Sequence, residues 1–179
     1  VTSPDGFFLI CALDHLSDFR ALLDPDPDKV DYGRTVEAKL DLIRTLSPEV
    51  SAFLVDPRYA LAQTIAARAL PGSTGLMSSI EDEGYHGAAT ARETKFRNGW
   101  GTRKIKLIGA DVCKLLWFYR PESDVAGHQR TLIQRLVVEC AALSLPLVVE
   151  PIWYPLAGED TASDSWKARS PTITFMQAT

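Results

Sequence analysis

The chain has 179 residues, of which 46% are hydrophobic and 23% are charged, and its formal net charge is -4. This composition is ordinary for a globular protein with one sizeable core, and the scattered basic residues form no run that would favour nucleic acid. No apolar stretch approaches the roughly 20 residues of a membrane-spanning helix, and the first residues lack the pattern of a secretion signal. We therefore expect a cytoplasmic protein that binds neither nucleic acid nor a membrane.

The first part of the chain shows two apolar runs separated by a helical pattern. Residues 7–14 (FFLICALD) and 51–56 (SAFLVD) each end in a carboxylate and are typical of strands buried on both faces of a parallel sheet. The prolines of the linker at 24–28 exclude a helix there. Apolar residues then recur at helical spacing from Val36 to Ile43, which predicts a helix between the two strands.

The same alternation continues towards the carboxyl end. Further strands are predicted at 75–81 (GLMSSIE), 111–119 (DVCKLLWFY) and 145–150 (LPLVVE). Helices are expected at 57–70, at 100–108 and along the apolar face of Leu132, Ile133, Leu136, Val137 and Cys140. Residues 82–99 are interpreted as a long loop after the third strand. Residues 157–179 form a polar tail, in which 172–176 (TITFM) is compatible with an isolated strand.

Strands that alternate with helices predict βαβ units and a parallel sheet. A doubly wound sheet is one alternative, but it usually carries a glycine-rich phosphate loop after its first strand, where this sequence has DHLSDF. We therefore predict an α/β fold of the (β/α)8 TIM-barrel type. Because such a barrel needs eight units and only five are recognisable, to about residue 156, we interpret residues 1–179 as one incomplete barrel domain.

Acidic residues close four of the predicted strands. In a parallel barrel the carboxyl ends of the strands meet at one face, so these side chains are expected around a common cavity. Each acid taken alone is equally compatible with a helix cap. Glu150 is followed by Pro151 and Ile152, which keep the chain extended, and we expect an enclosed carboxylate suited to proton transfer. The four acids are Asp14, Asp56, Glu81 and Glu150.

Lys114 lies inside the predicted strand at 111–119. Burial of an unpaired ammonium group costs several kcal/mol or more, so the side chain requires a partner. We expect it to point into the cavity and to pair with Asp14 or Glu150, with Glu150 favoured because it ends the neighbouring strand. The alternatives are a lysine at a frayed strand end or one paired for structure alone.

Two further residues are candidates for substrate contact. His15 follows Asp14 directly and either touches substrate or caps a helix. Arg120 follows the strand at 111–119 and either holds an anionic group at the rim or is an exposed surface arginine. No metal or other cofactor is expected, since His86 and His128 have no partners at metal-ligand spacing and the cysteines form no CxxC pair.

Five motifs of this sequence resemble those of a known family in their order and spacing. The combined set is far more specific than any single motif, and it covers nearly the whole chain to about Pro155. It resembles tagatose 1,6-bisphosphate aldolase and is similar to the sulfofructosephosphate aldolases of the same superfamily. The motifs are ALDH at 12–15, FLVDPRYAL at 53–61, EDEGYHG at 81–87, GADVCKLLWFYRP at 109–121 and LPLVVEPIWYP at 145–155.

The resemblance implies a class I aldolase that cleaves a phosphorylated ketose into dihydroxyacetone phosphate and an aldehyde without a metal. In that family a lysine amine attacks the ketone, and the resulting iminium accepts the electrons of the broken carbon–carbon bond. Lys114 matches the accessory lysine, which keeps the nucleophilic amine deprotonated. Glu150 matches the acid/base carboxylate, and Asp14 matches the acid that contacts substrate hydroxyls. Asp56 matches a further site acid whose role is less defined.

The sequence departs from the family pattern at two places. The family continues its first motif as D-[HQ]-R-G, whereas this sequence has Leu16 and Ser17 after Asp14 and His15. The rim arginine is therefore missing unless Arg20 replaces it, and a sulfo-sugar phosphate is an alternative substrate. The family's Schiff-base lysine on strand six and its phosphate loops after strands seven and eight have no counterpart before Thr179. This predicts a truncated chain, and a non-catalytic fragment is therefore an alternative to an active aldolase.

An incomplete barrel also leaves the first and fifth strands with unpaired edges. Such edges favour pairing with another chain. We therefore expect low solubility or a homo-oligomer.

Overall fold

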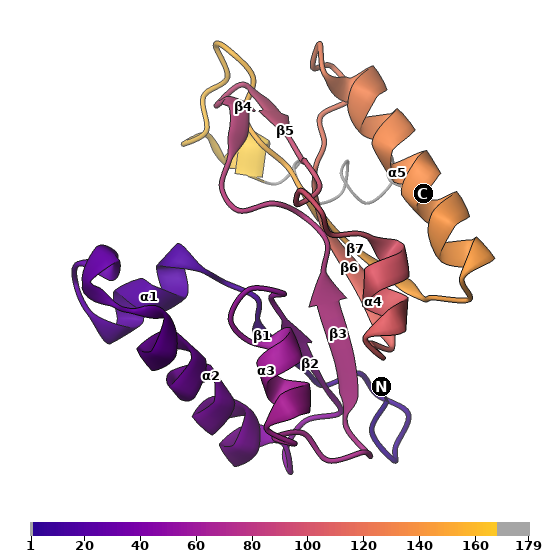
Figure 1. Cartoon of the computed structure of the whole chain (residues 1–179). Coiled ribbons are helices and arrows are strands. Elements are labelled where there is room, and N and C mark those ends of the chain that lie inside the picture. Colours follow the sequence, from indigo (N-terminus) through magenta and orange to yellow (C-terminus); the bar gives the residue numbers. More distant parts are fainter. Residues whose placement is uncertain (1, 168–179) are drawn as a thin grey trace. The chain divides into compact units, whose positions relative to one another are not determined.

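The computed structural model describes residues 2–167, and its elements follow the predicted alternation of strands and helices (Figure 1). The strands are β1 (Ile10–Leu13), β2 (Ala52–Val55), β3 (Gly75–Ser79), β4 (His86–Ala88), β5 (Ala91–Glu93), β6 (Val112–Phe118) and β7 (Leu147–Ile152). The helices are α1 (Ser17–Leu23), the 3-10 turn η1 (Pro27–Lys29), α2 (Tyr32–Leu46), α3 (Leu61–Ala66), α4 (Thr102–Leu107) and α5 (Ala126–Ala142). The possible strand at 172–176 lies outside the described residues.

Five strands form one sheet in the order β1-β2-β3-β6-β7. The pairings β1–β2, β2–β3 and β3–β6 are parallel, with Ile10 opposite Ala52 and Met77 opposite Val112. The strands thus follow the order of the chain, interrupted only by β4 and β5, which form a separate antiparallel pair. Sequential order is that of a barrel and rules out the doubly wound alternative, in which the strand order reverses.

The described chain divides into two compact units. The first holds the residues up to Ser79 together with Arg103–Lys114, and the second holds Ile80–Thr102 together with the residues from Leu115 onward. No helix among the described residues is long and apolar enough to cross a membrane.

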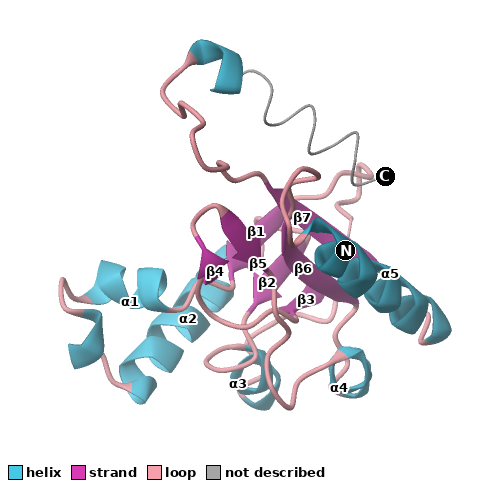
Figure 2. Ribbon diagram, turned by 90° about the horizontal axis from the view of Figure 1, so that it is seen from above, coloured by secondary structure: helices cyan, strands magenta, loops and turns pink. Residues whose placement is uncertain are grey.

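The core of the first unit forms where β2 and β3 are covered on both faces. Every residue of these two strands is buried, which for β2 was predicted from its apolar run. Side chains from three neighbouring strands meet there: Ala52, Leu54, Met77 and Val112. In Figure 2 the helices α1, α2 and α3 of this unit lie outside the strands. Removal of this apolar area from water stabilises the unit by about 25 cal/mol per Å².

The first strand differs from the prediction. Only Ile10–Leu13 pairs as β1, and the preceding apolar residues are not buried: Phe7 is 72% exposed and Phe8 67% exposed. The expectation of a strand from 7 to 14 buried on both faces was therefore wrong. The physical reason is that β1 is the edge strand of the sheet and has a hydrogen-bonded neighbour on one side only.

Two short helical elements follow β1 where none was predicted. Helix α1 covers Ser17–Leu23 and buries Phe19. The linker that was expected to exclude any helix contains the single turn η1, which begins at Pro27. Proline is tolerated at a first helical position because the missing N–H would have no intrahelical acceptor there. The Asp26 side chain also accepts a hydrogen bond from the backbone N–H of Asp28 at 3.3 Å.

In the second unit, the predicted loop at 82–99 contains the hairpin β4–β5. Thr94, directly after β5, attaches this hairpin to β6: its hydroxyl donates to the carbonyl of Leu116 and accepts from the N–H of Phe118, both at 2.9 Å. The tight pairing also requires Gly87, which has a positive φ of 76° and whose Cβ, if present, would collide with the carbonyl of Ala91. Three-residue strands carry too little pattern to be recognised in a sequence.

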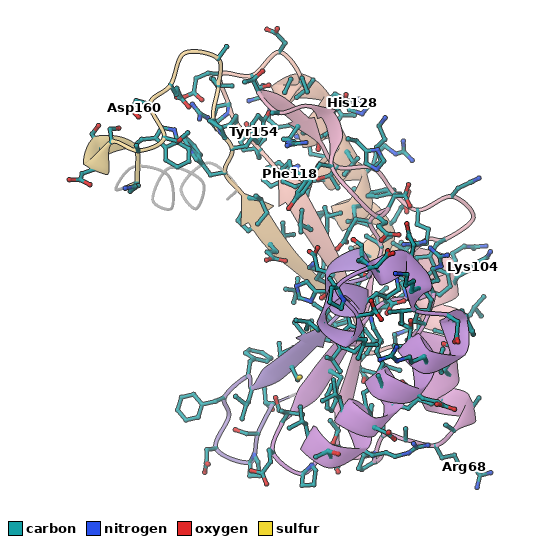
Figure 3. The ribbon with its side chains drawn as sticks, turned by 90° about the vertical axis from the view of Figure 1, so that its left-hand side faces the viewer. Arg68, Lys104, Phe118, His128, Tyr154 and Asp160 are labelled. Carbon is teal, nitrogen blue, oxygen red and sulfur yellow. The ribbon has the colours of Figure 1, made fainter. Side chains whose placement is uncertain are left out.

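Aromatic side chains fill the interior of the second unit. Trp117 lies near the end of β6 and Tyr119 directly after it, so both side chains project from the same face of the chain. Their rings stack with centroids 4.3 Å apart. On the other side of the chain Phe118 meets Tyr154 edge to face at 6.4 Å, and both are labelled in Figure 3. Such aromatic pairs contribute about 0.5–1.5 kcal/mol beyond their area burial. On α5 the buried residues are Ala126, Gln129, Leu136 and Cys140, whereas Val137, expected on that face, is exposed.

The exposed apolar residues before β1 generate a testable prediction. We expect the wild-type chain to associate, and Phe8→Lys to raise the monomer fraction severalfold, because an edge lysine opposes strand pairing. Light scattering over a concentration series measures this. Leu22→Lys is the matched control, since Leu22 is equally apolar and 82% exposed but lies on α1. A wild-type chain that is monomeric throughout would contradict the prediction.

Candidate active site

The first unit brings a lysine and an acid together beside the carboxyl ends of β1 and β3. Lys114 lies near the middle of β6 and its Nζ is 2.9 Å from Oδ2 of Asp14, the residue directly after β1. Their side chains are only 4% and 11% exposed. The sequence predicted a buried Lys114 paired with Asp14 or Glu150, and Asp14 is the partner observed. Pairing with Glu150 stays a prediction.

This pair is electrostatically strong because little water reaches it. A hydrogen bond between two charged groups is roughly twice as strong as a neutral one, and low local polarity strengthens it further. His15 lies beside the pair, with its Nδ1 3.9 Å from Asp14 Oδ1 and a side chain that is largely exposed. His15 is thus placed to meet a ligand that approaches Asp14 from solvent, and its predicted substrate contact stays a prediction.

Asp56 has a different environment from Asp14, although both close a strand. It is fully buried after β2, where Oδ1 accepts hydrogen bonds from the N–H groups of Arg58 and Tyr59 at 2.8 and 2.6 Å. Its other oxygen, Oδ2, accepts from Lys39 Nζ at 2.5 Å. These bonds support the turn that leads into α3. Asp56 does not cap α3, whose N-cap is Ala60, and the substrate contact predicted for Asp56 stays a prediction.

Lys39 is the residue that the sequence analysis missed. It lies on the buried face of α2 with Thr35, Leu40 and Ile43, and none of its side chain is exposed. Its position is a signal that a sequence can carry, because a lysine beside Leu40 and four residues after Thr35 falls on the apolar stripe of the helix. A lysine on that face indicates either that the helix prediction is wrong or that the ammonium group has a partner. Here the partner is Asp56.

The remaining predicted acids belong to the second unit. Glu81 is half-buried and its backbone pairs with that of Phe96. Glu150 lies in β7 and is exposed, so the expectation of an enclosed carboxylate was wrong. The reason is that β7 is the other edge strand of the sheet, and its residues alternate between partly and largely exposed. The acid/base role expected of Glu150 stays a prediction.

Arg120 is not the exposed surface arginine that was one of its two predicted environments. Its side chain is 1% exposed, and its guanidinium forms a two-bond pair with Glu159, with both N–O distances 2.7 Å. The same group donates to the carbonyl of Tyr154 at 2.7 Å and stacks on Trp153, 3.9 Å from the ring centroid. The guanidinium thus ties the chain beyond β7 to the end of β6. Anion binding by Arg120 stays a prediction and would require Glu159 to move.

The described residues contain no group of three or more His, Cys, Asp or Glu side chains that could hold a metal ion. The Lys114–Asp14 pair and the neighbouring His15 offer an amine, a carboxylate and an imidazole. These groups can bind hydroxyl and carbonyl oxygens and exchange protons with them.

Comparison with solved structures identifies the class of fold. A protein of Corynebacterium glutamicum superimposes with a TM-score of 0.66 at 20% identity, covering 97% of this chain and 58% of that one. An archaeal fructose 1,6-bisphosphate aldolase superimposes with a TM-score of 0.60 at 16% identity, covering 98% of this chain and 64% of that one. These likenesses confirm an α/β fold of the aldolase TIM-barrel type, present as an incomplete barrel.

Curated relatives then give the particular group. Tagatose 1,6-diphosphate aldolase 1 of Enterococcus faecalis is 33% identical over 135 residues, which cover 74% of this chain and 41% of the relative. Tagatose 1,6-diphosphate aldolase 2 of Streptococcus pyogenes serotype M1 is 28% identical over 164 residues, covering 90% and 49% respectively. The chain is a homologue of proteins named tagatose 1,6-diphosphate aldolase, and it spans less than half of their length. No protein-family model matches it.

The Arg120–Glu159 pair predicts a pH-dependent stability. The hydrogen bonds from Arg120 lower the pKa of Glu159 from 4.5 to about 2. A lowered carboxyl pKa means that the stabilisation is complete above about pH 4.5 and is lost as the pH falls towards 2. Because Glu159 is partly exposed, we expect Glu159→Gln to cost only about 1–2 kcal/mol at neutral pH and to flatten the pH dependence in that window.

Unfolding monitored by tryptophan fluorescence measures this effect, since Trp153 stacks on Arg120 and Trp166 donates to Glu159 at 2.9 Å. Glu122→Gln is the matched control, because Glu122 meets Arg120 through one longer bond of 3.2 Å. Identical pH profiles of Glu159→Gln and the wild type would show that the ion pair does not stabilise the unit.

Proposed function

We propose that this chain carries part of the active site of a class I aldolase that reversibly cleaves a phosphorylated ketose, resembling tagatose 1,6-bisphosphate, into dihydroxyacetone phosphate and an aldehyde. The observation that carries the proposal is the buried contact between Asp14, directly after β1, and Lys114, which lies within β6 opposite Ser79 at the carboxyl end of β3. This is the face on which barrel enzymes of this type build their active sites. The names of the homologues support the same reaction class.

Lys114 is suited to assist imine chemistry. A fixed cation beside a second amine disfavours protonation of that amine, and only a neutral amine attacks a ketone. Asp14 holds the Lys114 ammonium in one place and keeps further lone pairs for the hydroxyl groups of a sugar. In this proposal Glu150 accepts the proton of the hydroxyl group next to the bond that breaks, and its exposed position leaves it accessible to a substrate.

Reductive trapping tests whether the chain performs this chemistry. We expect borohydride in the presence of dihydroxyacetone phosphate to leave a reduced adduct on Lys114: its ammonium group passes a proton to Asp14, the neutral amine attacks the ketone in place of a second amine, water leaves, and hydride reduces the imine. Intact and peptide mass spectrometry locate the adduct. Lys114→Met should reduce trapping by about 100-fold or more, in line with the loss of a group that acts in catalysis.

Lys29→Met is the matched control, since Lys29 is an exposed lysine of the same unit. It should trap as well as the wild type. Unphosphorylated dihydroxyacetone should trap less well than the phosphate ester if the site recognises a phosphorylated ketose. A wild-type chain that yields no adduct on any lysine would contradict the proposal that this chain performs imine chemistry.

A further inference from the structure

A second buried lysine lies next to the proposed site without belonging to its chemistry. Lys39 projects from the buried face of α2, and its side chain is completely covered. A buried ammonium group persists only if its charge and all three of its N–H donors are compensated. The identity of these three partners indicates what Lys39 does.

The three partners are two backbone carbonyls and one carboxylate. Lys39 Nζ lies 2.7 Å from the carbonyl oxygen of Leu13, 2.7 Å from that of His15 and 2.5 Å from Oδ2 of Asp56. The ring of Phe19 packs against the same ammonium group, 4.8 Å from its centroid. The ammonium group is therefore compensated by charge, by hydrogen bonds and by an aromatic face.

The two carbonyls belong to the residues on either side of Asp14. In extended backbone, alternate carbonyls point in the same direction, so one ammonium group can bind both of them. This fixes the backbone before and after Asp14, and it leaves the Asp14 side chain to reach Lys114 at 2.9 Å. The exit of β1 is thus held between two lysines, one that binds its backbone and one that binds its carboxylate.

The carboxylate that binds Lys39 is also held in place. Asp56, which holds the third N–H of Lys39, is itself anchored by the N–H groups of Arg58 and Tyr59 at the start of the segment leading to α3. Lys39 therefore connects the exit of β1 to the exit of β2. All of these groups lie in the first unit.

We propose that Lys39 is a positioning residue whose ammonium group fixes the backbone on both sides of Asp14 and thereby holds the Asp14 carboxylate against Lys114. The catalytic meaning of this inference rests on the proposed function, since it assumes that Asp14 and Lys114 act on substrate. The contacts themselves involve no substrate, so they are testable without one.

The test measures how fast Lys114 reacts with an acylating reagent for amines, by peptide mass spectrometry of the full chain. Loss of a charge-assisted hydrogen bond should release the amine, so Asp14→Asn and Lys39→Met should each raise the labelling rate of Lys114 roughly tenfold. Lys29→Met, which removes an exposed lysine, should leave that rate unchanged.

The combination of Lys39→Met with Asp14→Asn distinguishes positioning from general support of the fold. If Lys39 acts through Asp14, the double variant should label Lys114 no faster than Asp14→Asn alone. Fully additive effects would overturn the inference, because a merely structural lysine would loosen the site whether or not Asp14 is present. Unchanged Lys114 labelling in Lys39→Met would overturn it as well.

A second variant guards against misfolding, since Lys39→Met leaves Asp56 as a buried charge without this partner. Lys39→Met combined with Asp56→Asn removes both charges, and the new side-chain amide retains an oxygen that can accept from the N–H groups of Arg58 and Tyr59. This double variant should still label Lys114 faster than the wild type, because no cation binds the carbonyls of Leu13 and His15. If Lys114 in this double variant were labelled at the wild-type rate, the inference would be overturned.

The result is independent of the trapping experiment with dihydroxyacetone phosphate. Faster labelling in the Lys39 variants together with no trapped adduct would support the positioning role and reject the proposed function. A trapped adduct in the wild type together with unchanged Lys114 labelling in the Lys39 variants would support the proposed function and reject the positioning role.

Discussion

The structure of the first unit depends on the compensation of two buried ammonium groups. Lys39 and Lys114 enter the same region from a helix and from a strand, and they pair with Asp56 and Asp14, respectively. An ammonium group without a partner costs several kcal/mol in such surroundings. The exits of β1 and β2 must therefore lie where their carboxylates reach the two cations, and the apolar packing of the strands has to accommodate this.

A pair of this kind is an unusual way to stabilise a protein, because two apolar side chains of similar size often serve stability as well or better. What the ions provide is a fixed geometry, since charged hydrogen bonds are directional and apolar contacts are not. The contrast between the units is informative here. In the second unit Arg120 is also buried and bonded, but its partner Glu159 is partly exposed, so the bond serves to fasten a segment of chain.

The sequence predicted those parts of the fold whose physical signals are local and strong. The apolar run of β2 correctly indicated a buried strand, and a lysine within an apolar run correctly indicated a buried, paired Lys114. The burial predicted for residues of β1 and β7 was wrong because these are the edge strands of the sheet. Whether a strand has a neighbouring strand on each side cannot be deduced from its local sequence pattern. The hairpin β4–β5 and the Arg120–Glu159 pair depend on single contacts between distant residues and left no periodic signal.

Asp14 and Asp56 show why a residue's position in a motif does not define its role. Both are aspartates that follow a buried or edge strand of the same sheet, and both bind a lysine. Asp56 also binds two backbone N–H groups of its own turn and is fully buried, so three donors already bind its carboxylate away from solvent. Asp14 is partly accessible and lies beside an exposed histidine, so it retains acceptor capacity for a ligand. Partners and access to solvent, rather than residue type, therefore separate the acid that supports the site from the acid that can act in it.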